Sequence, residues 1–223
     1  MTTALLSSTY FGPVQWYQKL NRFDRVLIEQ HDSFIKQTYR NRCVIATTQG
    51  TQALTIPIER NSSSAQTSSS PMKEIRISNH GKWRAEHWNA LQSAYGDSPF
   101  FDYYVDDLHP FFEKHWDFLF DFNLDITLKM CELLDITPDI ALTDAFTPPS
   151  DVALSPPSPV QYAASLMQLA DYREAIRPKH PLPDPTFEPH PYYQVYRQKH
   201  GFLPNLSILD LLFNMGNESI LYL

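Results

Sequence analysis

The stretch ALLSSTYFGPVQWYQKLNRFDRVLIEQ, residues 4–30, decides the expected fold. Residues 4–9 are expected to form a short strand, and YFGP forms the turn that ends it. Pro13 is well placed to open a helix over residues 14–23, because its missing N–H costs nothing in a first turn. Residues 25–30 have the pattern of a second strand. This order of strand, loop, helix and strand predicts a parallel sheet covered by helices.

A β-hairpin is expected directly after this unit. Residues 42–48 (RCVIATT) and 52–59 (QALTIPIE) have strand character, and Gln49, Gly50 and Thr51 separate them with the loop length and the glycine typical of hairpin turns. Pro57 lacks a donor for the ladder, so the second arm is expected at a sheet edge.

Helical periodicity dominates the middle of the chain. Residues 74–78 (EIRIS) alternate as a fifth strand would, and Asn79 could cap the helix that follows. An amphipathic helical pair with an acidic outer face is expected between residues 97 and 133. The residues expected to share the buried face of the first helix are Trp83, His87, Leu91 and Tyr95, and those of the pair are Phe112, Leu119, Phe122, Ile126, Met130 and Leu133.

Two segments have unusual composition. Residues 60–72 are rich in serine and have almost nothing to bury, which predicts a flexible loop. Most of the 18 prolines lie in residues 148–191, which predicts an extended segment that wraps the surface, with a helix over 160–176 between two proline-rich arms. A strand over 192–198 and a helix over 207–216 are expected at the end, the helix with Ser207 and Asp210 at capping-box spacing and Gly216 at its end.

These elements together predict a single α/β domain over residues 1–223. Its sheet is expected to be mixed and mostly parallel, and it combines the N-terminal β-loop-helix-β unit, the helical pair and the proline-rich wrap. With 223 residues, the chain is long enough to bury one substantial core without splitting into two domains.

Composition and charge exclude several classes of protein. A net charge of −7 without a basic tail argues against a nucleic-acid binder. The first residues lack a secretory signal and no window approaches 18 apolar residues, so no membrane partner and a cytoplasmic location are expected. Cys43 and Cys131 are too few for a disulfide framework, and Cys43 is expected to be a packed core thiol rather than an activated one. Self-association is left open.

Metal and cofactor motifs are absent from the sequence. His80 and His87 are seven residues apart and His109 and His115 six, so neither pair places two ligands on one helical face, and no metal site is expected. The sequence contains no G-x-G-x-x-G, P-loop, G-x-S-x-G or H-E-x-x-H motif, so the cofactor is unknown. His87 is expected to be a hydrogen-bonded core histidine.

A basic cluster lies in residues 31–42, at the start of the stretch HDSFIKQTYRNRCVIATTQGTQALTIPIE. Lys36, Arg40 and Arg42 lie within seven residues, and a guanidinium at a strand entrance can clamp a phosphate or carboxylate in bidentate fashion. Pairing of these arginines with the chain's own acids is an equally weighted alternative. The irregular stretch near the end offers further polar groups, Lys199, His200 and Asn205.

Several stretches resemble the WbqC-like family of bacterial proteins, nearly along the whole chain. They are STYFGPVQWYQKL, FIKQTYRNRCVI, LTIPI, HGKWRAEHWNALQSAYGDSPFF and YYQVYRQKHGFLPNLSILDLLFNMG. The residues that match the family pattern are Tyr10, Lys36, Asn41, Arg42, Trp83, Asn205, Ser207 and Asp210. Gln30 and His31 stand where many relatives have paired acids, and SLMQLADYREAIRPKH lacks the glycines found there in many relatives.

The resemblance implies a role in bacterial surface-polysaccharide (O-antigen) precursor synthesis. The expected substrate is an anionic small molecule, a nucleotide-linked amino sugar, and acyl or aminoacyl transfer is the implied reaction. His31 or His200 would be the general base, since histidine accepts protons near neutral pH. A non-catalytic binding or scaffold protein of the same pathway is the alternative. The residues expected to bind substrate are Tyr10, Gln15, Lys36, Arg40, Asn41, Arg42, Lys199 and Asn205.

Overall fold

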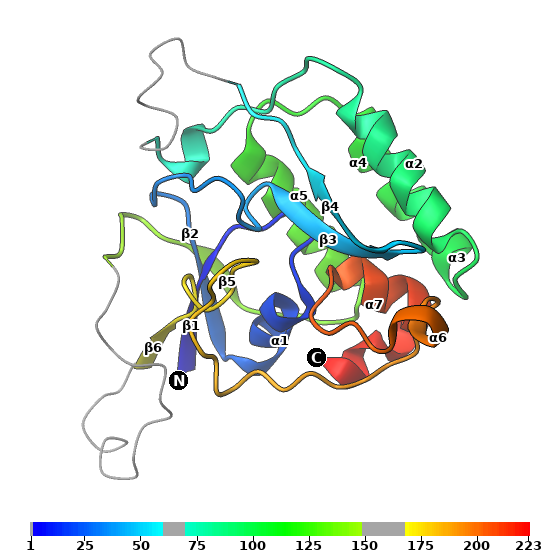
Figure 1. Cartoon of the computed structure of the whole chain (residues 1–223). Helices are drawn as coiled ribbons and strands as arrows, with labels where there is room; N and C mark the ends of the chain where they lie inside the picture. The colour runs from blue at the N-terminus through cyan, green and yellow to red at the C-terminus, as the bar shows by residue number, and fades with distance from the viewer. Residues whose placement is uncertain (1, 60–69, 149–167) are drawn as a thin grey trace.

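A four-stranded parallel sheet forms the centre of the protein. The computed structural model describes residues 2–59, 70–148 and 168–223. Strands β1 (Thr2–Ser7), β2 (Arg25–Glu29), β5 (Ile140–Leu142) and β6 (Gln168–Asp171) lie in the order β5-β2-β1-β6 (Figure 1). All three pairings are parallel. The predicted α/β class with a mostly parallel sheet is confirmed.

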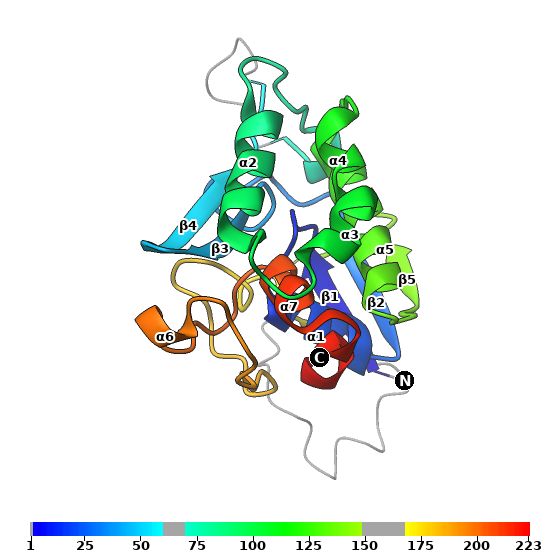
Figure 2. The ribbon, with the colours of Figure 1, turned by 90° about the vertical axis from the view of Figure 1, so that its right-hand side faces the viewer.

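The N-terminal β-loop-helix-β unit is confirmed. Helix α1 (Val14–Arg22) connects β1 to β2 and begins directly after Pro13, its N-cap. It buries Trp16, Tyr17 and Leu20, each at 1% exposure or less. Both α1 and α5 (Leu119–Leu133) lie to the right of the strands in Figure 1, on one face of the sheet, and Figure 2 views that face.

The predicted hairpin is confirmed, but it forms a sheet of its own. Strands β3 (Arg42–Thr47) and β4 (Gly50–Thr55) pair antiparallel, and the two-stranded sheet is separate from the parallel one. The turn consists of residues 48–49, whereas residues 49–51 were predicted, so it begins one residue earlier and is one residue shorter. The outer edge of β3 is covered, because Val44 O accepts from Ser207 N at 2.8 Å and Ala46 N donates to Tyr95 Oη at 3.1 Å.

Helices pack around these two sheets. Their bounds are α2 Trp83–Tyr95, α3 Phe101–Leu108, α4 Pro110–Glu113, α6 Arg197–His200 and α7 Ile208–Met215, with 3-10 turns η1 Met72–Glu74 and η3 Gly216–Tyr222. Trp83, His87, Leu91 and Tyr95 are all buried, as the spacing predicted. Asn79 does not cap α2, whose N-cap is Lys82. The Asn79 side chain instead accepts a hydrogen bond from Arg84.

Three local predictions are corrected by the structure. Residues 74–78 make only isolated bridges, such as Ile58 with Ile77, and no strand. The described part of the predicted helix 160–176 contains β6, because these residues pair with Thr2–Leu5 of β1. Residues 192–196 form no strand, and the helix α6 follows them. Residues 60–69 and 149–167, parts of the predicted loop and proline-rich wrap, lie outside the described residues.

Helix α7 has the predicted ends, but Asp210 does not have the predicted capping role. Ser207 Oγ caps it by accepting from Leu209 N, and Gly216 follows its last turn. Asp210 makes no capping box. Its buried carboxylate accepts from Tyr95 Oη at 2.9 Å, Tyr192 Oη at 2.7 Å and Gln194 Nε2 at 2.8 Å, which fixes the segment before α6 to the core. Within the described ranges, no helix has the length and apolar character needed to cross a bilayer.

Candidate functional site

The order of the parallel strands points to one edge of the sheet. The chain places β2 and then β5 on one side of β1, and β6 on the other side. The direction of winding therefore reverses between β1 and β6. Ligands in open α/β sheets bind outside the carboxyl ends of the strands at such a reversal.

Buried polar side chains gather at the carboxyl ends of these strands. Ser7 and Thr9 follow from β1, Glu29 and Asp32 from β2, Thr143 from β5 and Arg173 from β6, and Arg40 joins them from the loop after β2. Each of these residues is at most 9% exposed. We call this set the carboxyl-edge cluster: Ser7, Thr9, Glu29, Asp32, Arg40, Thr143 and Arg173.

Glu29 connects the loops that leave three of the strands. Its Oε1 accepts from His31 N at 2.7 Å and from Thr143 Oγ1 at 2.8 Å, and its Oε2 accepts from Thr147 N at 2.9 Å. Arg173 Nη1 lies 3.6 Å from the same carboxylate, and its Nη2 pairs with Asp171 at 2.6 Å. Through these contacts, Glu29 fixes the positions of the loops after β2 and β5 and of Arg173 after β6.

Asp32 and Arg40 form a second buried ion pair, between Oδ2 and Nη2. Burial raises the pKa of the Asp32 carboxyl, although the charge of Arg40 opposes this change. Asn123 on α5 donates from Nδ2 to Arg40 O at 2.8 Å and to Ser8 Oγ at 2.9 Å, so α5 positions both the loop and the end of β1. Of the two roles that the sequence left open for Arg40, the structure shows the pairing with an internal acid.

Several atoms of the cluster lack the partner that burial normally demands. Within the described part of the chain, no hydrogen-bond partner is found for Ser7 Oγ, Thr9 Oγ1, Asp32 Oδ1 or Arg40 Nε. An unpaired buried polar atom costs about 1–3 kcal/mol, so such atoms are rare unless something else uses them. These four atoms have donor or acceptor capacity that the described residues do not use.

The rim of the cluster carries positive charge. Lys36 is exposed in the loop after β2, and Lys179 in the segment after β6 donates to Gln37 Oε1 at 3.1 Å, so the two segments meet. His31 Nε2 lies 3.1 Å from Thr143 O. A carbonyl only accepts, so Nε2 carries the proton and Nδ1 has the free lone pair in the neutral ring.

Other predicted binding residues have structural partners close to the hairpin. Tyr10 is fully buried, and its Oη lies 2.9 Å from His87 Nδ1. Asn41 Nδ2 donates to Ile56 O at 2.8 Å, and Arg42 Nε donates to Thr55 Oγ1 at 3.0 Å. Cys43 is buried and burial raises the pKa of its thiol, which confirms the packed core thiol.

Gln15 and Asn205 contact each other across the chain. Gln15 N donates to Asn205 Oδ1 at 3.0 Å, and Asn205 Nδ2 donates to Gln15 Oε1 at 3.0 Å. Gln15 Nε2 also donates to Asp184 Oδ2 at 2.8 Å. This pair therefore connects the start of α1 with two later segments of the chain.

Lys199 and His200 lie at the turn of the hairpin. Lys199 Nζ donates to Thr48 O at 2.6 Å, and His200 Nε2 lies 3.1 Å from Thr47 O. Arg42 begins β3 and Thr47 ends it, so about 17 Å of strand separates this turn from the basic cluster at roughly 3.3 Å per residue. His31 and Arg40 thus lie at the carboxyl edge of the parallel sheet, with Lys36 in the loop between them, whereas His200 and Lys199 lie at the hairpin turn.

The acids and hydroxyls of the cluster were not predicted as site residues from the sequence. Ser7 and Thr9 lie in the last part of the predicted strand 4–9, and Glu29 and Asp32 lie close to the end of the predicted strand 25–30. That position was the available signal, because the carboxyl ends of parallel strands share one edge. The sequence did not indicate Arg173 as a site residue, because the segment that forms β6 was expected to be a helix. Among described residues, no three His, Cys, Asp or Glu side chains are arranged to hold a metal ion.

These features define an α/β protein with a parallel sheet and a buried polar cluster at the carboxyl edge of that sheet. The sequence model of the WbqC-like protein family matches residues 8–222, and the chain belongs to this family. It is 27% identical over 229 residues to an uncharacterized protein, Rv1507c, of Mycobacterium tuberculosis (strain ATCC 25618 / H37Rv), covering 99% of this chain and 96% of the relative. No solved structure matches the chain.

Proposed function

We propose that this protein is an enzyme of bacterial surface-polysaccharide precursor synthesis that binds a nucleotide-linked amino sugar at the carboxyl-edge cluster. The observation that carries the proposal is the set of buried polar atoms without partners: Ser7 Oγ, Thr9 Oγ1, Asp32 Oδ1 and Arg40 Nε, taken among the described residues. They lie beyond the strand ends beside the reversal between β1 and β6, where α/β sheets bind nucleotides.

The charges of the cluster suit both halves of such a substrate. Lys36 at the rim and the unpartnered Nε of Arg40 can bind the diphosphate, and Arg173, which is paired with Asp171 and Glu29, adds positive charge beside them. Asp32 offers an unpaired carboxylate oxygen to the hydroxyl or amino groups of the sugar. A purely cationic site would suit a free phosphate equally well, whereas this mixture of charges favours an amino sugar.

His31 is the proposed general base for acyl or aminoacyl transfer. Nδ1 of its neutral ring can accept a proton from the sugar amine while the amine nitrogen attacks the acyl carbonyl. A carbon–nitrogen bond forms, and the bond between the carbonyl carbon and the leaving group of the donor breaks. His200 is too distant to act on the same atoms, because it binds the hairpin turn.

A matched pair of serine variants tests the site. Ser7 and Ser98 are buried to a similar degree, at 9% and 8% exposure, but Ser98 Oγ donates to Tyr95 O at 2.6 Å whereas Ser7 Oγ has no partner in the described part of the chain. Ser7→Ala should leave the free energy of unfolding unchanged or raise it, and weaken nucleotide-sugar binding by about three- to tenfold. Ser98→Ala should lower the free energy of unfolding by about 1 kcal/mol and leave binding unchanged.

The measurements are calorimetric titration and thermal unfolding. The probes are a panel of nucleotide-linked amino sugars, the corresponding nucleoside diphosphates and the free amino sugars, and the intact nucleotide sugar should bind tightest. At 100 times Kd it should stabilise the fold by about 2.7 kcal/mol. Absence of binding across the panel would refute the enzyme and favour the scaffold alternative; destabilisation by Ser7→Ala would refute the ligand role of its hydroxyl.

A further inference from the structure

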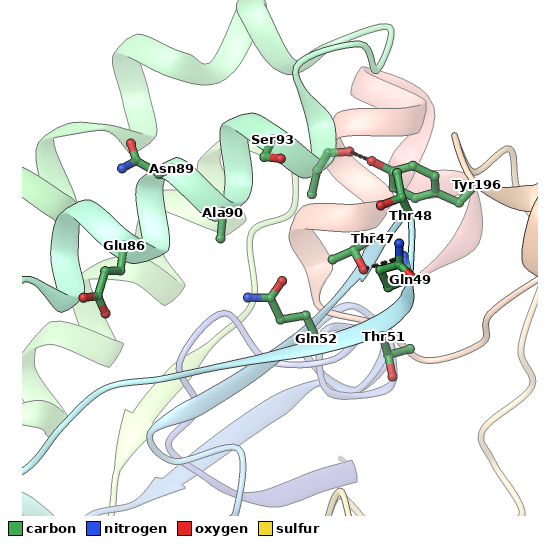
Figure 3. Close-up of a pocket in the computed structure, with 11 residues that line it drawn as sticks. Thr47, Thr48, Gln49, Thr51, Gln52, Glu86, Asn89, Ala90, Ser93 and Tyr196 are labelled. Atoms are coloured by element: carbon green, nitrogen blue, oxygen red, sulfur yellow. Dashed lines mark hydrogen bonds between the residues drawn. The ribbon is translucent and has the colours of Figure 1, made fainter.

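A concave site lies at the tip of the hairpin. A groove of about 680 Å³ separates the tip of β3 and β4 from helix α2 (Figure 3). It is remote from the carboxyl-edge cluster and shares no residue with it. The residues that line it include Thr51, Gln52, Glu86, Asn89, Ala90 and Tyr196.

The lining is rich in hydroxyl and amide groups. The Gln52 amide and the Glu86 carboxylate point from opposite walls into the space between hairpin and helix (Figure 3). Glu86 is the single acid among the described lining residues, and none of them is a lysine, arginine or histidine. A phosphate or another anion would therefore meet a carboxylate and no cation in the lining.

Backbone groups of β4 add further donors and acceptors at the groove. Ile56 N donates to Asn41 O, so residues 50, 52, 54 and 56 direct their backbone groups toward β3. The backbone groups of Thr51 and Ala53 consequently point to the outer edge of β4. In the described part of the chain, no strand pairs with that edge. Thr51 thus has a backbone donor and acceptor that no strand of the described chain uses.

Tyr196 and two alanines supply the apolar part of the lining. The Tyr196 hydroxyl donates to Ala94 O at 2.7 Å, which fixes the ring against the end of α2. Ala90 and Ala94 present short side chains, which leave room in the groove. The lining thus combines a fixed aromatic ring with many groups that both donate and accept hydrogen bonds.

We propose that this groove binds an uncharged saccharide unit. Each sugar hydroxyl both donates and accepts, as amide and hydroxyl side chains do, and the C–H face of a pyranose ring packs against an aromatic ring. A volume of about 680 Å³ lies within the range of roughly 300–1,000 Å³ typical of small-ligand sites. The site needs no phosphate and is separate from the nucleotide-sugar site proposed above.

Saturation-transfer NMR and titration of the full-length protein test this site. The probes are free neutral hexoses, N-acetylhexosamines and their disaccharides, without phosphate or nucleotide. At least one should bind saturably in the millimolar range or below. The double variant Gln52→Ala/Asn89→Ala should raise its Kd at least tenfold. Both side chains are exposed, so the fold should survive.

Gln92→Ala is the matched control. Gln92 is an exposed amide on the same helix, three residues after Asn89, and it does not line the groove. Its removal should change Kd less than twofold. Absence of saturable binding for every saccharide, or equal affinity in the double variant and the wild type, would overturn the proposal. Failure of the nucleotide-sugar panel would not, because these probes carry no phosphate.

Discussion

Buried polar side chains of this protein differ in whether they have partners. The Asp210 carboxylate accepts from three side chains and needs no ligand. Ser7 and Thr9 bury hydroxyl oxygens that find no partner among the described residues. Buried polar groups therefore stabilise the fold around Asp210, and in our proposal they bind substrate at Ser7 and Thr9.

His87 should make stability depend on pH between about 4 and 6.5. Burial lowers the pKa of His87 to about 4, so the folded state keeps the ring neutral at pH values where the unfolded chain binds a proton. The unfolded state therefore gains protons first, and stability falls as pH decreases through this window. The loss due to His87 should approach about 3 kcal/mol at pH 4, from a shift of about 2.5 pKa units.

The measurement is the free energy of unfolding from denaturant titrations at pH 4 to 7. His87→Gln removes the titrating ring and keeps an acceptor for the Tyr10 hydroxyl. The difference in stability between wild type and this variant should shrink as pH falls. Parallel curves for the two proteins would contradict the assigned pKa.

The environment of a single residue could be predicted where residues close in sequence determine it. His87 and Cys43 were correctly expected to be buried, because both lie on strongly periodic apolar faces. The partner of Arg40 was not predictable, since a guanidinium beside many acids fits an internal pair and a ligand equally well. Asp32 supplies that partner through a loop whose path the sequence does not specify.

At the scale of elements, two glycines end helices in the same backbone region but in different surroundings. Gly216 after α7 has a φ of 55°, and a Cβ there would lie 2.7 Å from the ring of Phe100. Gly201 after α6 has a φ of 71°, with no atom within 4 Å of a Cβ among the described residues.

Both Gly→Ala variants should lose stability, but by different amounts. The left-handed backbone alone costs about 1–3 kcal/mol, which is the whole effect expected for Gly201→Ala. Gly216→Ala should lose about 1–3 kcal/mol more, because the methyl group overlaps the Phe100 ring. Equal losses in denaturant unfolding would show that the ring moves aside without cost.

Elements formed by local sequence were predicted better than those that depend on distant partners. The unit β1, α1 and β2 follows from proline, turn and strand signals within 30 residues. Residues 168–171 were assigned to a helix because their pairing partner, Thr2–Leu5, lies far away in the sequence. Residues 192–198 have strand composition, but Tyr192 and Gln194 bind Asp210 and no strand partner.

At the scale of the whole molecule, the proline-rich region from 178 to 191 crosses α1 and is held there by a buried ion pair. Lys19 Nζ lies 2.7 Å from Asp184 Oδ2 and 2.6 Å from Thr186 Oγ1, and the two charged side chains are 1% and 3% exposed. Gln18 Nε2 also donates to Glu188 O at 3.3 Å. These contacts join α1 to a segment with few hydrogen-bonded elements of its own.

Asp184→Asn should release this region. Breaking one partner leaves the buried Lys19 unpaired, with a cost of about 3 kcal/mol, whereas the exposed pair of Arg25 and Asp139 at 3.6 Å is worth at most about 1 kcal/mol. Asp139→Asn is therefore the control. Limited proteolysis should cut residues 178–191 faster in Asp184→Asn alone. Unchanged cleavage rates would show that Gln15 and Gln18 hold the segment without the ion pair.

The pairing of β1 with β6 also sets an order of assembly during protein synthesis. Thr2–Leu5 leave the ribosome well before their partner residues 168–171, because the two segments lie far apart in the sequence. A nascent chain that ends before this point has an open β1 edge and lacks Arg173 at the carboxyl-edge cluster. Such an edge can pair with other strands, so the growing chain depends on fast closure or on chaperones until β6 arrives. The ligand that we propose for this cluster can therefore assist folding only after β6 has joined the sheet.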